Sequence, residues 1–139
     1  MLITPCLWFD GQARAAAEFY CGIFPNSKII SDTGLVVNFE LNGQSYMGLN
    51  GGNQFVFTEA VSFVILCQDQ NEIDYYWDNL IADGGSEGDC GWCKDKYGLS
   101  WQVVPAVFEE LMSNPEKRER VVQAFLKMKK FEIAKLENA

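Results

Sequence analysis

VSFVILCQDQNEIDYYWDNLI, residues 61–81, joins an apolar run to a helical pattern with only a short turn between them. Residues 61–67 are apolar apart from one serine, which is typical of a buried strand. Asp69 is followed three residues later by Glu72, a signature of a helix N-terminus. The next apolar residues recur at three- and four-residue spacing, and they are Ile73, Tyr76, Trp77, Leu80 and Ile81. The segment therefore predicts a strand followed by a helix with one buried face.

The same pattern occurs earlier in the chain, in TPCLWFDGQARAAAEFYCGIF at residues 4–24. Subtracting 57 from the apolar helix positions of the later copy gives Ala16, Phe19, Tyr20, Ile23 and Phe24. The same subtraction relates Ser62 to Pro5 and Leu66 to Phe9. A match at one fixed spacing indicates an internal repeat.

Turn signals divide the residues after each helix into strands. In the first half, residues 28–33, 35–41 and 44–49 read as strands. Asn42 and Gly43 lie between the last two, and they predict a β-hairpin because both central residues of a type I′ turn need positive φ. In the second half, strands are expected near residues 90–94 and at residues 99–104, with turns at residues 83–85 and 95–98.

The residues after Pro105 have a helical pattern. Asn114 and Pro115 form a helix start, and an apolar stripe follows at Val121, Val122, Phe125, Leu126 and Met128. Two or three short helices are therefore expected to close the chain.

These elements predict an α+β fold built from two βαβββ modules with short C-terminal helices. The first module covers about residues 1–53, the second about 58–105, and the helices about 106–137. With 139 residues and 48% hydrophobic content, the chain is long enough for one good core, so a single domain is expected.

Charge and hydropathy exclude several kinds of partner. The net charge is -8 and the pI is near 4.4, so no basic surface is expected to bind nucleic acid or an anionic membrane. The sequence has no apolar run near the ~20 residues of a membrane-spanning helix and no secretory pattern at its start. We therefore expect a cytoplasmic protein.

Cysteine and histidine usage narrow the possible chemistry. The five cysteines are scattered and odd in number, which favours free thiols in a reducing compartment. There is no histidine, so Ser-His and Cys-His nucleophile pairs and histidine metal ligands are excluded. Cys90 and Cys93 form a C-x-x-C motif, but it lies in a predicted hairpin rather than at a helix N-terminus, which favours a structural role over a redox one. One such pair also supplies only two ligands, so a zinc site is not expected.

Six short motifs together resemble one protein family. They are Thr4–Asp10, Glu18–Tyr20, Phe39–Gln44, Cys90–Trp92, Lys94–Gly98 and Ser100–Pro105. With the two βαβββ halves, they closely resemble the PhnB-like branch, labelled 3-demethylubiquinone-9 3-methyltransferase, of the glyoxalase/bleomycin resistance/dioxygenase (vicinal oxygen chelate) superfamily. The resemblance spans nearly the whole chain, including the C-terminal helical stretch.

The resemblance implies strands that curve into a mixed sheet around an open cleft, in a homodimer whose modules pair within or between chains. The Ser31–Gly34 connection is shorter than is common among relatives, which implies a more open cleft mouth. Methyl transfer has no support in the sequence, since no Gly-rich turn after a strand, followed by an acidic partner, indicates a nucleotide-derived cofactor. No cofactor is expected.

In metal-dependent relatives four side chains of the inner strands bind one divalent cation. Carried over one at a time, these positions fall on or beside Pro5, on Tyr46 or Met47, on or beside Ser62, and on Gln102. None of these side chains is a carboxylate or an imidazole, so the resemblance implies a site without metal.

The same positions are candidates for ligand binding in the cleft. Ser62 and Gln102 would either hydrogen-bond a ligand or satisfy local polar groups and water. Trp8, Trp101 and Tyr46 would either line an aromatic pocket or fill the core and a dimer interface.

Three functional hypotheses follow. The first is metal-free binding or sequestration of a small molecule in the cleft, by burial and a few neutral hydrogen bonds. The second is a metal-independent enzyme of the same fold that acts on a small organic substrate through Glu40 or a cysteine, although Glu40 alternates with apolar residues and is expected on the solvent face. The third is a dimeric interaction module with no ligand.

Overall fold

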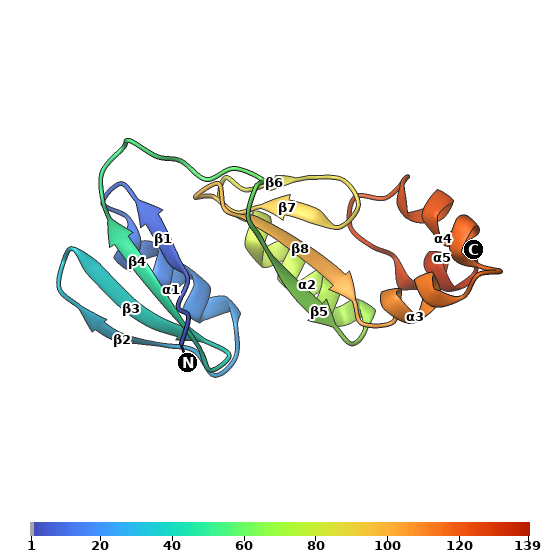
Figure 1. Cartoon of the computed structure of the whole chain (residues 1–139), viewed down its shortest axis with the longest axis horizontal. Helices are drawn as coiled ribbons and strands as arrows, with labels where there is room; N and C mark the ends of the chain where they lie inside the picture. The colour runs from blue at the N-terminus through green and yellow to red at the C-terminus, as the bar shows by residue number, and fades with distance from the viewer. Residues whose placement is uncertain (1) are drawn as a thin grey trace. The chain divides into compact units, whose positions relative to one another are not determined.

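The computed structural model describes residues 2–139. It divides into two compact units, the first ending at Phe57 and the second covering Thr58–Ala139. Figure 1 shows that each unit has its own sheet, with a single long helix against one face. This confirms the predicted α+β class and its two repeated modules.

The first unit has the order β1(Cys6–Phe9), α1(Ala13–Ile23), β2(Lys28–Asp32), β3(Val36–Leu41), β4(Gln44–Asn50). Its four-stranded sheet has the strand order β1-β4-β3-β2. β1 is parallel to β4, and the other neighbours are antiparallel. The predicted hairpin turn is confirmed, since Asn42 has φ 49° and Gly43 has φ 80°.

The core of the first unit lies between α1 and the sheet. α1 buries Ala13, Ala16, Ala17, Tyr20 and Ile23 against the strands. Tyr20 stacks on Phe39 at 6.4 Å between ring centroids, and Phe39 stacks on Tyr46 at 5.7 Å. Aromatic pairs at these separations add to the stability that burial provides. This layer fixes which side of each strand faces α1.

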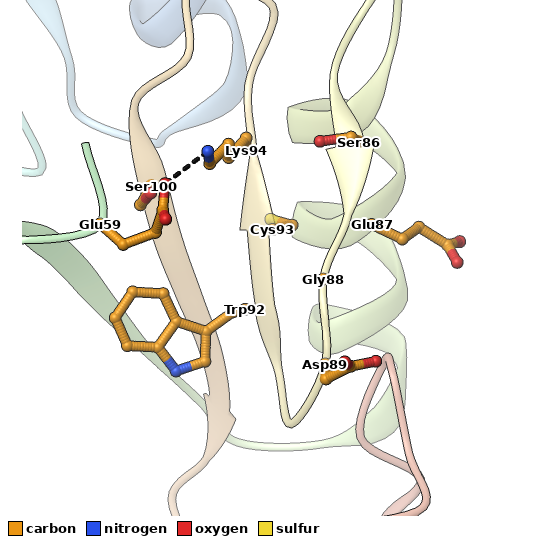
Figure 2. Close-up of a pocket in the computed structure, with 9 residues that line it drawn as sticks. All are labelled: Glu59, Ser86, Glu87, Gly88, Asp89, Trp92, Cys93, Lys94 and Ser100. Atoms are coloured by element: carbon orange, nitrogen blue, oxygen red, sulfur yellow. Dashed lines mark ion pairs between the residues drawn. The ribbon is translucent and has the colours of Figure 1, made fainter. Parts of the chain in front are cut away.

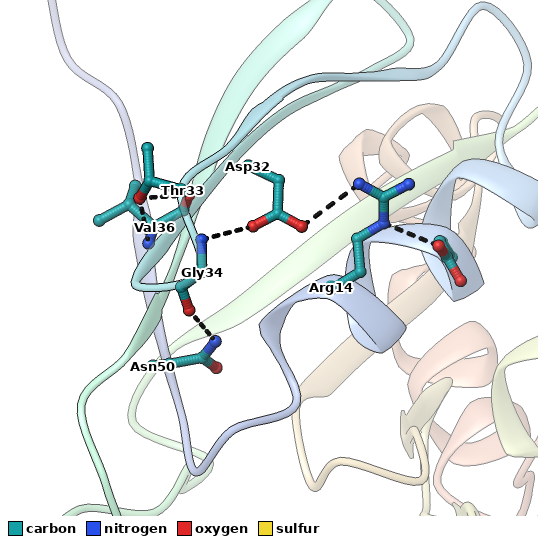
Figure 3. Close-up of polar contacts among 7 residues, drawn as sticks. Arg14, Asp32, Thr33, Gly34, Val36 and Asn50 are labelled. Carbon is teal, nitrogen blue, oxygen red and sulfur yellow. Dashed lines mark hydrogen bonds and ion pairs between the residues drawn. The ribbon is translucent and has the colours of Figure 1, made fainter.

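Asn50, the last residue of β4, holds the β2–β3 turn and the start of α1 together. Its Nδ2 donates to the Gly34 carbonyl at 2.9 Å, as Figure 3 shows. Its Oδ1 accepts from the Ala13 backbone N–H at 2.9 Å. Asp32 accepts from the Gly34 N–H at 2.8 Å and from Arg14 Nη1 at 3.3 Å. The short connection between β2 and β3 that the sequence indicated is therefore a turn held by side-chain hydrogen bonds.

The second unit repeats this arrangement. Its order is β5(Ser62–Cys67), α2(Gln70–Ile81), β6(Ser86–Glu87), β7(Trp92–Lys94), β8(Ser100–Pro105), and its strand order is β5-β8-β7-β6. The predicted cap is confirmed, because Asp69 accepts from the Glu72 N–H at 2.9 Å. β7 begins later than predicted because Cys90 and Gly91 have positive φ, 56° and 83°, and form a turn.

The turn between β7 and β8 is organised by one buried carboxylate. Asp95 is 2% exposed. It accepts from Trp101 Nε1 at 2.9 Å and from the backbone N–H groups of Tyr97 and Leu99 at 2.9 and 3.1 Å. A buried carboxylate is tolerated because these donors replace its hydration. Trp101 is thereby fixed on the side of the sheet that α2 covers.

The repeat spacing is 57 for the helices but 58 for the first strands. Adding 57 to the bounds of α1 gives 70–80, which matches α2. β1 ends at Phe9, however, and β5 ends at Cys67, and both residues are buried under their helices. The turn before α1 is one residue longer, and a shift of one residue moves every side chain of a strand to the opposite face. Ser62 therefore corresponds to Thr4, and the alignment of Ser62 with Pro5 is corrected.

Three short helices, α3(Phe108–Ser113), α4(Arg118–Phe125) and α5(Ile133–Glu137), follow β8, as predicted. Phe131 packs against Phe108 and Phe125 at centroid distances of 5.4 and 6.2 Å. Gln70 holds this segment with both ends of its amide, since its Nε2 donates to the Phe131 carbonyl at 2.9 Å and its Oε1 accepts from the Ile133 N–H at 2.8 Å. The C-terminal segment is therefore fixed to the second unit.

The segment also holds the turn that precedes β7. The Cys90 and Gly91 N–H groups donate to the carbonyls of Met128 and Lys129 at 2.9 and 2.8 Å. A Cβ on Gly91 would lie 2.4 Å from the Phe131 ring and 3.0 Å from the Val103 carbonyl oxygen.

Among the helices of residues 2–139, none is both long and apolar enough to cross a membrane.

Replacing Asn50 by alanine should lower the free energy of unfolding by about 2 kcal/mol, because the buried Ala13 N–H loses its acceptor. Urea denaturation would measure the change. Asn53→Ala removes the same side chain at an exposed bend and should change stability by less than about 0.5 kcal/mol. Equal effects of the two substitutions would contradict the role given to Asn50.

Gly91→Ala should destabilise the protein more than Gly34→Ala. Both glycines have similar positive φ, 83° and 85°, so both variants have the same backbone strain of about 1–2 kcal/mol. Only at Gly91 does the new methyl group meet Phe131, which should add about 1–3 kcal/mol. Thermal denaturation of the two variants would show whether the C-terminal segment is packed on this turn.

Candidate functional site

The second sheet has one covered face and one uncovered face. α2 contacts β5, β7 and β8 on the face that contains Cys93, Trp101 and Val103, and Figure 1 shows this helix behind the strands. Because side chains alternate along a strand and paired residues share a face, the pairing register defines the other side. We call this side the open face, and its residues are Ser62, Val64, Leu66, Trp92, Lys94, Ser100, Gln102 and Val104.

Two apolar side chains of the open face are exposed to solvent. Val64 is 55% exposed and Leu66 is 65% exposed, although both lie within β5. Beside them, Gln102 Nε2 donates to Ser62 Oγ at 2.9 Å. The structure therefore places the predicted residues Ser62 and Gln102 together, as a neutral polar pair next to exposed apolar surface.

Trp101, another predicted cleft residue, lies on the covered face. It is 3% exposed, and its ring packs edge-on against Phe63 at 5.5 Å. Its Nε1 donates to Asp95. The ring of Trp101 belongs to the core beneath α2.

In the first unit, Tyr46 and Met47 lie on opposite faces of β4. Tyr46 stacks on Phe39 toward α1, and burial raises the pKa of its hydroxyl. Met47 pairs with Cys6 on one side and Asn38 on the other, so it faces away from α1. Met47 corresponds to Gln102, because Gln102 pairs in the same way with Val64.

Pro5 and Trp8 also lie on opposite sides of the first sheet. The Pro5 carbonyl accepts from the Met47 N–H at 2.9 Å, which extends the pairing of β1 with β4 by one residue. Strand alternation puts Pro5 on the side of Leu7 and Phe9, which α1 covers. Trp8 lies on the uncovered side, where its Nε1 donates to the Gly52 carbonyl at 2.8 Å. Its ring packs edge-on against Phe55 at 4.8 Å.

A pocket of about 550 Å³ opens beside the open face, at the β6–β7 hairpin (Figure 2). It is lined by Glu59, Ser86, Glu87, Gly88, Asp89, Trp92, Cys93, Lys94 and Ser100. Three of these residues, Trp92, Lys94 and Ser100, also belong to the open face. The pocket and the open face are therefore parts of one surface.

Each charged side chain that lines this pocket has a different partner. Lys94 Nζ lies 2.5 Å from Glu59 Oε1, and this hydrogen bond holds the pKa of the Glu59 carboxyl below its usual range. Glu87 turns away from the pocket in Figure 2 and accepts from Trp77 Nε1 at 3.3 Å. Asp89 pairs with Lys129 at 3.6 Å. Lys94 is thus the cation that faces the pocket.

Ser100 lies beneath the Glu59–Lys94 ion pair. It is 0% exposed, and its hydroxyl has no hydrogen-bond partner among residues 2–139. It pairs directly with Lys94 on β7 and with Ser62 on β5. Burying a hydroxyl without a hydrogen-bond partner costs free energy. A ligand in the pocket could supply the missing partner.

Sequence reasoning missed Lys94, Glu59 and Ser100 as site residues. Ser100 could have been found, because it lies two residues before the predicted residue Gln102 and so shares its face of a predicted strand. Lys94 pairs with Ser100 across two strands, which only the folded chain shows. Glu59 has no such signal, since it lies in the connection between the modules and reaches Lys94 only in the folded chain.

The thiols are poorly suited to nucleophilic or redox chemistry. All five cysteines are free. Burial raises the pKa of Cys67 and of Cys93 to about 12. The C-x-x-C motif spans a turn with positive φ at Cys90 and lies outside any helix start, where thiol pKa values are lowered. The arrangement favours the structural interpretation.

The side chains at the family's metal positions do not fit a divalent cation. These positions hold Thr4 and Met47 on the uncovered face of the first unit, and Ser62 and Gln102 on that of the second. Their side chains offer hydroxyl, thioether and amide groups. Such neutral donors are poor ligands compared with carboxylate or imidazole. Within residues 2–139, no group of three or more His, Cys, Asp or Glu side chains is placed to hold a metal ion.

Iodoacetamide at pH 8 should modify the exposed Cys6 well before Cys67 and Cys93. With a pKa of about 12, only about one Cys93 side chain in ten thousand is a thiolate at this pH. Mass spectrometry of peptides after timed alkylation would give the order, and all cysteines should react in guanidinium chloride. Rapid modification of native Cys93 would support a redox-active motif instead.

Comparison with known proteins gives one family match. The family model described as 3-demethylubiquinone-9 3-methyltransferase matches residues 1–104. The C-terminal helices lie outside this match, so the resemblance is shorter than the sequence motifs implied. Among curated proteins, none has a sequence that matches the chain.

Solved structures agree with the family match. A PhnB protein from Bacillus cereus, carrying the same methyltransferase label, is 32% identical, with 76% of this chain and 100% of that chain covered and a TM-score of 0.69. Protein PA1353 from Pseudomonas aeruginosa is 16% identical over 76% of this chain and 97% of its own, with a TM-score of 0.61.

A fosfomycin resistance protein, FosX, from Listeria monocytogenes, solved with Mn(II) and sulfate, is 16% identical over 81% of this chain and 95% of its own, with a TM-score of 0.61. At this identity the likeness is one of fold. The chain belongs to the PhnB-like family described as 3-demethylubiquinone-9 3-methyltransferase.

Proposed function

We propose that the protein binds or sequesters a small organic molecule on the open face of the second sheet, without a metal ion. The observation that carries this proposal is the exposure of Val64 and Leu66 beside the Ser62–Gln102 pair. Small-molecule sites are mostly apolar, with a few polar groups that fix the orientation of the ligand. This face has both features.

The polar pair keeps hydrogen-bonding capacity for a ligand. One N–H of the Gln102 amide is used by Ser62, which leaves a second N–H and the amide oxygen. Ser62 still has its hydroxyl proton to donate. A planar ligand with one carbonyl or hydroxyl group would therefore find both a donor and an acceptor beside an apolar surface.

The enzyme hypothesis has less support. Glu40 lies on β3 between the buried residues Phe39 and Leu41 and is only half-buried. Outside the open face, the buried thiols of Cys67 and Cys93 are held protonated by their raised pKa values. The exposed apolar residues also suit a partner surface, so the interaction-module hypothesis is an outcome that the experiments below distinguish.

We further propose that the protein works in the cytoplasm as a homodimer. The five free cysteines support a reducing compartment. The dimer is proposed from family resemblance, and it is read in the same experiment as the ligand.

Native mass spectrometry of protein purified rapidly without chelators should show a small organic adduct that dissociates on collisional activation. Elemental analysis of the same sample should give far less than one divalent ion per chain, because the donor set is neutral. One tightly bound divalent ion per chain would contradict the proposal that binding needs no metal. A dimer with no adduct, whose exposed apolar residues disappear into its interface, would favour the interaction module.

Gln102→Leu should weaken binding of the recovered ligand about tenfold, because a side chain of similar size loses its hydrogen bonds to the ligand. Isothermal titration calorimetry would measure the affinity. Gln123→Leu, at an exposed position of α4, is the matched control and should bind normally. If the two variants bind equally well, the ligand lies elsewhere.

A further inference from the structure

The cation of the pocket at the β6–β7 hairpin is already paired with an anionic group of the protein itself, the Glu59 carboxylate. The Glu59 carboxylate reaches Lys94 Nζ from the connection that precedes β5. The Glu59 side chain is 62% exposed. It can therefore move away from Lys94 into solvent without disturbing the packed core. Lys94 is thus a cation at a pocket, covered by a carboxylate that can be exchanged.

Ser100 supplies an independent reason to expect a ligand here. Its hydroxyl is fully buried and unpartnered among residues 2–139, and it lines the pocket under the ion pair. The register puts it directly across from Lys94. A ligand oxygen bound to Lys94 would therefore be within reach of a hydroxyl donor that otherwise has no partner.

The chemistry of the neighbours favours a monoanion. Glu59 and Asp89 line the pocket with their carboxylates, while Glu87 turns its carboxylate away. A dianion such as phosphate would therefore be repelled more strongly than a carboxylate. The volume of about 550 Å³ falls within the usual range of small-molecule sites. The carboxylate of Glu59 itself shows that this group fits against Lys94.

The rest of the ligand would lie along the open face. Trp92, Gln102 and Val64 form one row across the strands, and Lys94, Ser100 and Ser62 form the adjacent row. The two rows are two residues apart along each strand, or about 7 Å. A carboxyl group at the Lys94 row would place an aromatic ring of benzoate size over the Trp92 row.

We infer that this pocket binds the carboxylate of a small, flat organic acid, with Lys94 as its cationic partner and the Ser100 hydroxyl as a hydrogen-bond donor, and that the Glu59 carboxylate occupies this place until the acid displaces it. The inference deepens the proposed function and rests on it. It assigns the ligand class as monocarboxylic acids and makes Glu59 a built-in competitor.

The test is an NMR titration of ¹H–¹⁵N-labelled full-length protein with benzoate, benzyl alcohol and benzylamine. Benzoate should shift the signals of Lys94, Ser100 and the Trp92 indole, and it should bind at least about tenfold more tightly than the neutral and cationic analogues. Lys94→Gln should weaken benzoate binding about tenfold. Lys96→Gln makes the same charge change two residues away, outside the pocket, and should leave binding unchanged.

Glu59→Gln gives the sharpest test. If the Glu59–Lys94 ion pair only stabilised the fold, its loss should weaken benzoate binding and not tighten it. Removing the competing carboxylate should tighten benzoate binding at least about threefold, whereas Glu116→Gln, at an exposed site outside the pocket, should have no effect. Ser100→Ala should weaken binding about threefold without lowering the stability of the free protein, because the hydroxyl has no partner to lose.

The outcomes separate the two proposals. If benzyl alcohol binds the open face as well as benzoate, or if Glu59→Gln weakens benzoate binding, the acid site is wrong and the proposed function stands. If none of the three compounds shifts any open-face signal, both are wrong for ligands of this size. If Lys94→Gln fails to fold, the Glu59→Gln result alone still decides the inference.

Discussion

Each four-stranded sheet of this protein has one helix, and a helix can cover only one face. This constraint determines the burial pattern of the strands. Residues that alternate toward α1 or α2, such as Phe39 and Val103, are buried, and the residues between them must face elsewhere. In the second unit the uncovered side leaves Val64 and Leu66 of β5 exposed. The candidate site is a direct result of that incomplete covering.

Much of the fold could be predicted because its signals are local. The hairpin at Asn42 and Gly43 and the helix start at Asp69 depend on residues that are close in sequence. The C-terminal helices followed from an apolar stripe, but the predicted helix start at Asn114 and Pro115 was wrong, because Asn114 ends α3 and α4 begins at Arg118. β6, a strand of two residues, was not predicted, because two residues are too few to show an alternation.

The faces of the strands were harder to predict than the strands themselves. A single extra residue before α1 changes the repeat spacing of β1 relative to β5, and this moves Pro5 to the side that α1 covers. Tyr46 and Met47 could not be separated until the stacking of Tyr46 on Phe39 was known. Trp101 directly precedes Gln102, so strand alternation puts the two on opposite faces, and Asp95 fixes Trp101 in the core. The Glu59–Lys94 ion pair joins residues far apart in sequence, which no local pattern records.

The way Gln70 holds the C-terminal segment has a consequence for the order in which the protein is made. α3 and α5 have six and five residues, too few to be stable helices alone in water. They depend on an amide in the first turn of α2 and on the turn at Gly91. This segment follows the second sheet in the chain and has nothing to fold against until that sheet has assembled. Docking of this segment should therefore come after assembly of the second sheet, and a nascent chain stalled before Phe131 would present an incomplete aromatic cluster to chaperones.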